Sequence, residues 1–175
     1  SYDLDRWGKN REALKAAISQ LQASQADAEV VKLTLTTSIA RTYNQLARLY
    51  LLRDIAQQEV TQREQIERIT AGRIATGLDT EVERKTAQAN LATSRAALKS
   101  LDGQILATRY QIAALLGAGP DRGLQIARPS LALGDEVRLP DNLPADLVSR
   151  RPDIVAARWR VDAMTHDVKE AKAEF

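Results

Sequence analysis

The sequence T-A-G-R-I-A-T-G-L-D-T-E-V-E, residues 70–83, separates two segments that are both longer than the helices of ordinary globular domains. Gly77 can adopt the left-handed conformation that ends a helix. Thr80 and Glu83 have the spacing of a capping box that begins the next helix. Leu78 lies between the two signals and belongs to neither helix. Two interpretations are open: an ordinary hairpin turn, or a tip that presents Leu78 to a partner protein.

The segment before the turn predicts a single very long helix. From residue 9 to residue 74 it contains no proline, and Gly72, near its end, is its only glycine. A helix of about 65 residues would be roughly 100 Å long and would need neighbours along its whole length. Apolar and small residues recur at steps of three and four, which favours close helix packing: Leu14, Ala17, Leu21, Ser24, Ala28, Val31, Leu35 and Ser38.

The segment after the turn predicts a second helix over residues 81–116, which Gly117 and Pro120 end. Its apolar positions also alternate steps of four and three, as in a coiled coil: Ala87, Leu91, Ser94, Leu98, Leu101, Ile105, Thr108, Ile112 and Leu115. At about 36 residues, it covers only about half of the first helix.

A proline-rich stretch follows, residues 118–151, with irregular apolar residues and a short predicted helix over 145–150. Pro152 suits the first position of a third helix, which is expected to run to residue 175. Its predicted apolar stripe is Ile154, Ala157, Val161, Met164 and Val168. The second and third helices together are about as long as the first, so we expect both to stack end to end, antiparallel to it.

Composition excludes several kinds of function. The formal net charge is +2 with acids and bases interspersed, which argues against a nucleic-acid binder, and there is no cysteine. The only histidine, His166, is predicted to be a solvated surface residue without a metal or catalytic role. No catalytic, cofactor-binding or metal-binding residue is predicted, and no apolar run would span a membrane as a helix. The start at Ser1 without methionine suggests a piece of a longer protein.

Three stretches resemble one known family. They are S-Y-D-L-D-R-W-G at residues 1–8, A-G-R-I-A-T-G-L-D-T at 71–80, and L-P-D-N-L-P-A-D-L-V-S-R-R-P-D-I at 139–154. All three resemble segments of the outer membrane factor family, the TolC/OprM-like efflux channels, in particular their NodT-type lipoprotein branch. The last motif is the most specific of the three. In order and spacing, the resemblance covers essentially the whole chain and places it at the first-repeat periplasmic helices and equatorial segment.

The resemblance implies a homotrimer with a twelve-stranded β-barrel in the outer membrane and a long α-helical barrel in the periplasm. It implies as partners a periplasmic adaptor (membrane fusion) protein and an inner-membrane pump, with multidrug export as the function. No cofactor and no nucleic acid are implied, and the membrane would be contacted only by parts absent from this sequence. By similarity, the adaptor-binding tip would comprise Arg73, Thr76, Gly77, Leu78, Asp79 and Thr80. Thr76 and Ile74 depart from the residues usual in the family.

The expected fold is therefore all-α: a long antiparallel coiled-coil hairpin, one long helix against two shorter ones, with a loop-rich equatorial segment. The expected divisions are a strand-to-helix stub at 1–8, the hairpin at 9–117 with its tip at 75–80, the proline-rich segment at 118–151 and the third helix at 152–175. Two alternatives remain open at this point. One is a periplasmic adaptor or tether hairpin, although no flanking lipoyl-like β segments are readable; the other is a coiled-coil structural scaffold.

Overall fold

The computed structural model describes residues 8–130 and 146–173. This part of the chain contains helices and no strand, which confirms the predicted all-α class. The helices are α1 (Lys9–Ala75), α2 (Glu81–Leu115), α3 (Pro120–Leu124), α4 (Asp146–Ser149) and α5 (Pro152–Lys172). No helix in the described ranges combines the length and apolar content needed to cross a membrane.

The ends of the long helices lie close to where the sequence predicts them. α1 ends at Ala75, one residue later than expected, and α2 ends at Leu115, one residue earlier. α3 was not predicted; it begins at Pro120, whose fixed φ suits the first helical position. The predicted strand-like stub, apart from Gly8, lies outside the described residues, as do residues 131–145 of the proline-rich stretch.

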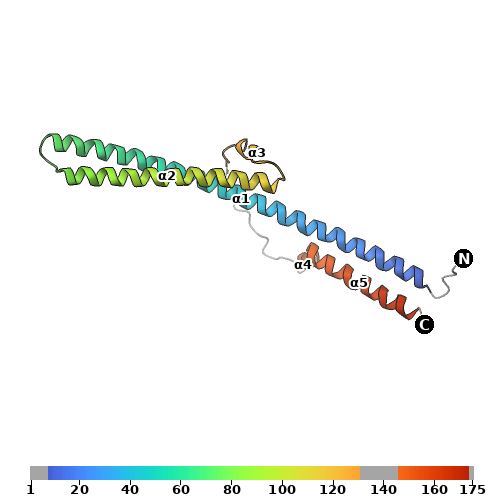
Figure 1. Cartoon of the computed structure of the whole chain (residues 1–175). Coiled ribbons are helices and arrows are strands. Elements are labelled where there is room, and N and C mark those ends of the chain that lie inside the picture. The colour runs from blue at the N-terminus through green and yellow to red at the C-terminus, as the bar shows by residue number, and fades with distance from the viewer. Residues whose placement is uncertain (1–7, 131–145, 174–175) are drawn as a thin grey trace. The chain divides into compact units, whose positions relative to one another are not determined.

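Two compact units divide the chain: Thr37–Leu133, and Ser1–Thr36 together with Gly134–Phe175. In the first unit, the C-terminal part of α1 packs along α2 (Figure 1). The pairing is antiparallel, because Arg53 contacts Asp102 whereas Glu64, further along α1, contacts Arg95, which is earlier in α2. Its apolar core is formed by buried residues with three partly buried neighbours: Leu46, Leu49, Ile105 and Ile112, with Tyr50, Leu101 and Ile126.

The α2 register predicted from spacing is confirmed. Its buried residues include six of the expected positions, namely Ala87, Leu91, Ser94, Ile105, Thr108 and Ile112. The remaining three, Leu98, Leu101 and Leu115, are partly buried. The buried Ser94 hydroxyl has a hydrogen-bond partner, because it donates to Glu59 Oε1 at 3.0 Å.

The segment after α2 contacts both long helices of this unit. The Arg109 guanidinium donates to the backbone oxygens of Leu124 and Ile126, each at 3.0 Å. Gly123 packs so closely that a Cβ there would lie 2.9 Å from the Arg109 carbonyl oxygen. Arg128 lies 2.6 Å from Asp54 of α1, with its guanidinium over the Tyr50 ring at 5.4 Å from the centroid.

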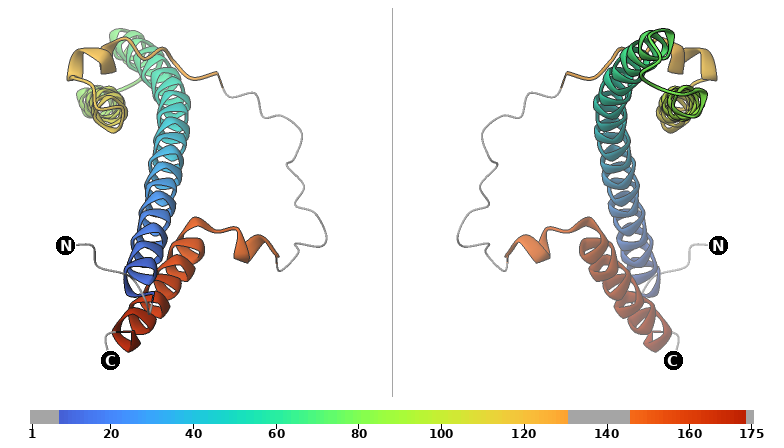
Figure 2. Two further views of the ribbon diagram at one scale, coloured as in Figure 1. Left: turned by 90° about the vertical axis from the view of Figure 1, so that its right-hand side faces the viewer. Right: turned by 90° about the vertical axis from the view of Figure 1, so that its left-hand side faces the viewer.

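In the second unit, α5 runs beside the N-terminal part of α1 (Figure 2). Among the described residues of this unit, those that are buried are small: Ala16, Ser19, Ala23, Ala156 and Ala163. Small side chains allow the two helix backbones to approach closely, and the Ser19 hydroxyl donates to Asp162 Oδ2 at 2.9 Å. An ion pair between Arg160 and Asp27 joins the same two helices.

The apolar stripes predicted for this unit are not the surfaces on which α1 and α5 pack against each other. Leu14, Leu21 and Val31 of α1 are more than half exposed. Val161, Met164 and Val168 of α5 are also more than half exposed. The spacing pattern identified the largest apolar residues. The α1–α5 contact instead uses alanines and a serine, and the sequence does not distinguish these buried small residues from the alanines and serines that face solvent. Of the large apolar residues in the predicted stripes, Leu14, Leu21, Val31, Val161, Met164 and Val168 remain on the surface, whereas Ile154 is partly buried.

The prediction that His166 is a solvated surface residue was wrong. Its side chain is only 15% exposed and lies between two carboxylates. Nδ1 is 2.6 Å from Glu12 Oε2, and Nε2 is 3.7 Å from Asp162 Oδ2. Hydrogen bonds from Lys15 and then from His166 lower the pKa of Glu12 to about 2. The sequence could not indicate this contact, because Glu12 and His166 are 154 residues apart.

Candidate functional site: the hairpin tip

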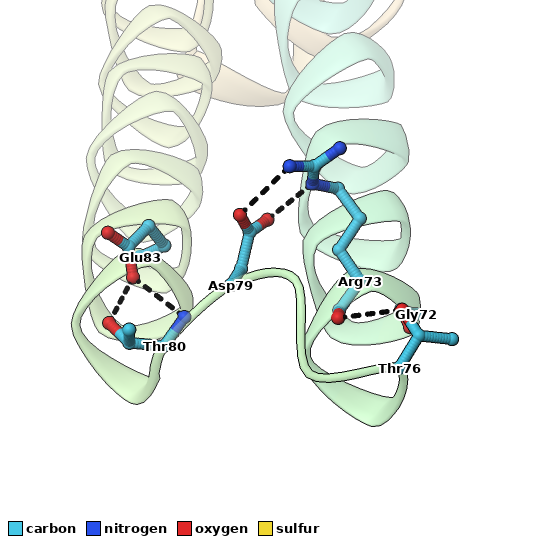
Figure 3. A network of polar contacts seen from close by, with 6 residues as sticks. All are labelled: Gly72, Arg73, Thr76, Asp79, Thr80 and Glu83. Atoms are coloured by element: carbon cyan, nitrogen blue, oxygen red, sulfur yellow. Dashed lines mark hydrogen bonds and ion pairs between the residues drawn. The ribbon is translucent and has the colours of Figure 1, made fainter.

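The turn between α1 and α2 is drawn in Figure 3. It begins where backbone hydrogen bonds cap the C-terminal end of α1. Gly77 has φ of +74°, in the left-handed region that a Cβ disfavours. Its N–H donates to the Ile74 carbonyl oxygen at 2.9 Å, and the Leu78 N–H donates to the Arg73 carbonyl oxygen at 2.9 Å. This pair of bonds is the Schellman motif, which satisfies backbone carbonyls that a helix end otherwise leaves open.

The start of α2 is closed in the same way. Thr80 is its N-cap, with φ −110° and ψ 168°, and its hydroxyl oxygen accepts from the Val82 N–H at 3.3 Å. The Glu83 carboxylate accepts from the Thr80 N–H at 2.9 Å and also from the Thr80 hydroxyl. The predicted capping box is therefore confirmed. These hydrogen bonds from Thr80 lower the pKa of Glu83.

A bidentate ion pair crosses the turn (Figure 3). The Arg73 Nε donates to Asp79 Oδ2 at 2.6 Å, and its Nη2 donates to Asp79 Oδ1 at 3.1 Å. Hydrogen bonding from Arg73 lowers the pKa of Asp79. The sequence singled out both residues but did not pair them, because they lie six residues apart on opposite sides of a glycine turn.

Two large apolar side chains point outward at this end of the hairpin. Leu78 is 67% exposed and Val82 is 71% exposed. Val82 was missed by sequence reasoning, although it is an apolar residue outside the α2 packing register. Beside it, a groove of about 380 Å³ lies between the two helices. The groove is lined by Ile66, Thr70, Val82, Glu83, Thr86, Ala87 and Asn90.

The tip residues predicted from the resemblance thus fall into two groups. The polar ones contact other tip residues: Arg73 pairs with Asp79, Thr80 with Glu83, and the Thr76 hydroxyl donates to the Arg73 carbonyl oxygen at 2.9 Å. Gly77 forms the turn, and Leu78 faces outward. Within the two described ranges, no group of acidic, histidine or cysteine side chains is arranged to hold a metal ion. The tip is held by these hydrogen bonds and presents a partly apolar surface.

This fold and site define a class of protein: long helical hairpins whose ordered turn faces outward. The family described as "Outer membrane efflux protein" matches residues 1–118. The chain belongs to this family.

Relatives match over the whole length of this chain. The fusaric acid resistance protein FusA of Burkholderia cepacia is 38% identical over 175 residues, which are 100% of this chain and 33% of FusA. The multidrug resistance outer membrane protein MdtP of Escherichia coli K12 is 32% identical over 173 residues, 99% of this chain and 35% of MdtP. The pyoverdine export outer membrane protein OpmQ of Pseudomonas aeruginosa is 33% identical over 176 residues, 99% of this chain and 36% of OpmQ. This chain therefore spans about a third of the length of these relatives.

Solved structures agree with these relatives. The outer membrane protein VceC of Vibrio cholerae superposes with a TM-score of 0.87 at 36% identity, covering 99% of this chain and 41% of VceC. The outer-membrane channel OprN superposes with a TM-score of 0.85 at 29% identity, covering 98% of this chain and 39% of OprN. The all-α hairpin is thus a part of an outer-membrane channel fold.

Proposed function

We propose that this chain is the periplasmic α-barrel portion of a trimeric outer-membrane efflux channel, and that its hairpin tip docks a periplasmic adaptor protein. The adaptor would connect the channel to an inner-membrane pump in a three-part export system. The single observation that carries the docking proposal is the ordered tip, which holds Leu78 67% exposed at the end of the hairpin. Family membership supports the channel assignment, as do the names of MdtP, for multidrug resistance, and OpmQ, for pyoverdine export.

The exposed stripes of the second unit support the barrel part of the proposal. Leu14, Leu21, Val161 and Met164 are large apolar residues that this chain alone leaves in water. Exposed large apolar side chains that gather into a patch are normally covered by another protein surface or a membrane. In a closed helical wall, neighbouring helices of the same trimer would cover it.

Both alternative functions fit less well. An adaptor or tether hairpin and a coiled-coil scaffold could share the long helices and even the closed turn. Neither accounts for a match to the outer membrane efflux family over residues 1–118, together with relatives that span all or nearly all of this chain.

The experiment is Leu78→Asp in the full-length channel, in a strain that lacks its own channel. We expect unchanged helicity and trimer formation but loss of export and of adaptor binding in a pull-down, because a charge replaces the outward apolar side chain. Leu78→Met, which keeps an apolar side chain, is the matched control and should retain both. Drug resistance equal to wild type in Leu78→Asp would contradict docking through the tip.

A further inference from the structure

The charged side chains of the tip, Arg73 and Asp79, form hydrogen bonds with each other. Both carboxylate oxygens of Asp79 accept from the Arg73 guanidinium, and the Asp79 side chain is only 19% exposed. Charge-assisted bidentate pairs are among the stronger polar contacts in proteins. A partner that bound the Asp79 carboxylate would have to compete with Arg73 for both of its oxygens.

Arg73 fixes the turn on both sides of Leu78. Its backbone oxygen accepts from the Leu78 N–H at 2.9 Å, while its side chain holds Asp79, the next residue. Leu78 is therefore anchored by its own backbone and by its neighbour's side chain, with its own side chain left outside. A contact residue held in place before binding loses less conformational freedom when it binds.

We propose that Arg73 and Asp79 are positioning residues, and that the surface contacting the partner is the apolar pair Leu78 and Val82. This inference rests on the proposed docking function. It divides the tip residues into those that position the turn and those that contact the adaptor. The partner surface is accordingly expected to be apolar opposite the tip, without a charged group matched to Arg73 or Asp79. Val82 belongs to the surface because it is 71% exposed in the first turn of α2, outside the packing register.

A charge exchange tests this assignment in the full-length channel. Arg73→Glu and Asp79→Arg would each break the pair, and the double variant would restore it with the charges reversed. For an exposed pair, we expect each single variant to weaken adaptor binding by about two- to fivefold. The double variant should recover most of that loss, because it rebuilds the clamp. A double variant as weak as the two single effects combined would mean that the charges contact the adaptor, and would overturn the proposal.

A second measurement does not depend on the adaptor. Amide hydrogen exchange at Leu78 reports the bond from its N–H to the Arg73 carbonyl oxygen. We expect faster exchange in each single variant and a return towards the wild-type rate in the double variant. Unchanged exchange in the single variants would also overturn the positioning role.

The outcomes separate this inference from the proposed function. If Leu78→Asp abolishes adaptor binding while the double variant fails to recover, docking stands and the positioning role falls. If Leu78→Asp leaves binding intact, docking through the tip itself is wrong. Val82→Asp completes the set, because it should weaken binding without changing the exchange rate at Leu78.

Discussion

Gly77 is the residue on which the tip geometry depends. At φ +74°, no neighbouring atom lies within 4 Å of the place where a Cβ would be built, so a substitution meets backbone strain and no steric clash. We expect Gly77→Ala to destabilise the chain by about 1 kcal/mol. Thermal unfolding followed by circular dichroism would measure the change.

The matched control is Gly103→Ala in the interior of α2, where a Cβ also meets no atom within 4 Å. Alanine has the higher helix propensity, so this substitution should stabilise the helix by roughly 0.5–1 kcal/mol. Two glycine-to-alanine changes would thus have opposite signs. Equal effects would show that the conformation of the turn does not require glycine.

Sequence reasoning at the residue scale succeeded where the signal is local. The capping box of Thr80 and Glu83 was predicted because its members are fixed by one helix turn. The Arg73–Asp79 pair could not be predicted from the sequence, because the approach of these side chains depends on the path of the backbone through Gly77. The roles of the tip residues in adaptor binding stay predictions.

Among the elements, α2 and α5 show why one packing register was predictable and the other was not. In α2, large apolar residues such as Leu91, Ile105 and Ile112 are the packing residues, so their spacing gives the register directly. In α5, the buried positions are Ala156 and Ala163, while the larger Val161 and Met164 are exposed. Apolar spacing in α5 therefore identifies an exposed face and not the contact with α1.

The α1–α5 pairing should depend on acid through Glu12. Its pKa is lowered from the ordinary 4.5 to about 2, because the ionised carboxylate accepts from Lys15 and His166. A carboxyl group with a lowered folded-state pKa stabilises the fold above its ordinary pKa, and this contribution is lost as the pH falls towards the lowered value. We therefore expect the pairing to weaken between about pH 4.5 and pH 2.

Hydrogen exchange in α5 across this range would detect the weakening. Asp79, Glu83 and Asp153 also have lowered pKa values and will contribute acid sensitivity elsewhere in the chain. Glu12→Gln is the control that separates them, because it removes only the Glu12 carboxyl group. An identical loss of protection in α5 of both proteins would contradict the assigned role of Glu12.

For the whole molecule, the exposed apolar surface predicts association. More than half of the Leu14, Leu21, Val161, Met164 and Val168 side chains is exposed. We expect the isolated 175-residue chain to self-associate, with a mass in light scattering that rises with concentration. Replacing Val161, Met164 and Val168 by glutamine should reduce the effect. A monomeric mass at every concentration would argue against these stripes as contact surfaces.

The contacts of the tip also bear on the order in which the chain folds. Every bond that closes the turn joins residues no more than six positions apart, whereas Ser19 and Asp162 are separated by 143 positions and Glu12 and His166 by 154. Closing a short loop costs less chain entropy than closing a long one. The turn can therefore form early, and the pairing of α1 with α2 can extend from it. The pairing of α5 with α1 forms later, because it closes a loop of more than 100 residues. The surface proposed for docking would be among the first parts of the chain to take its final form.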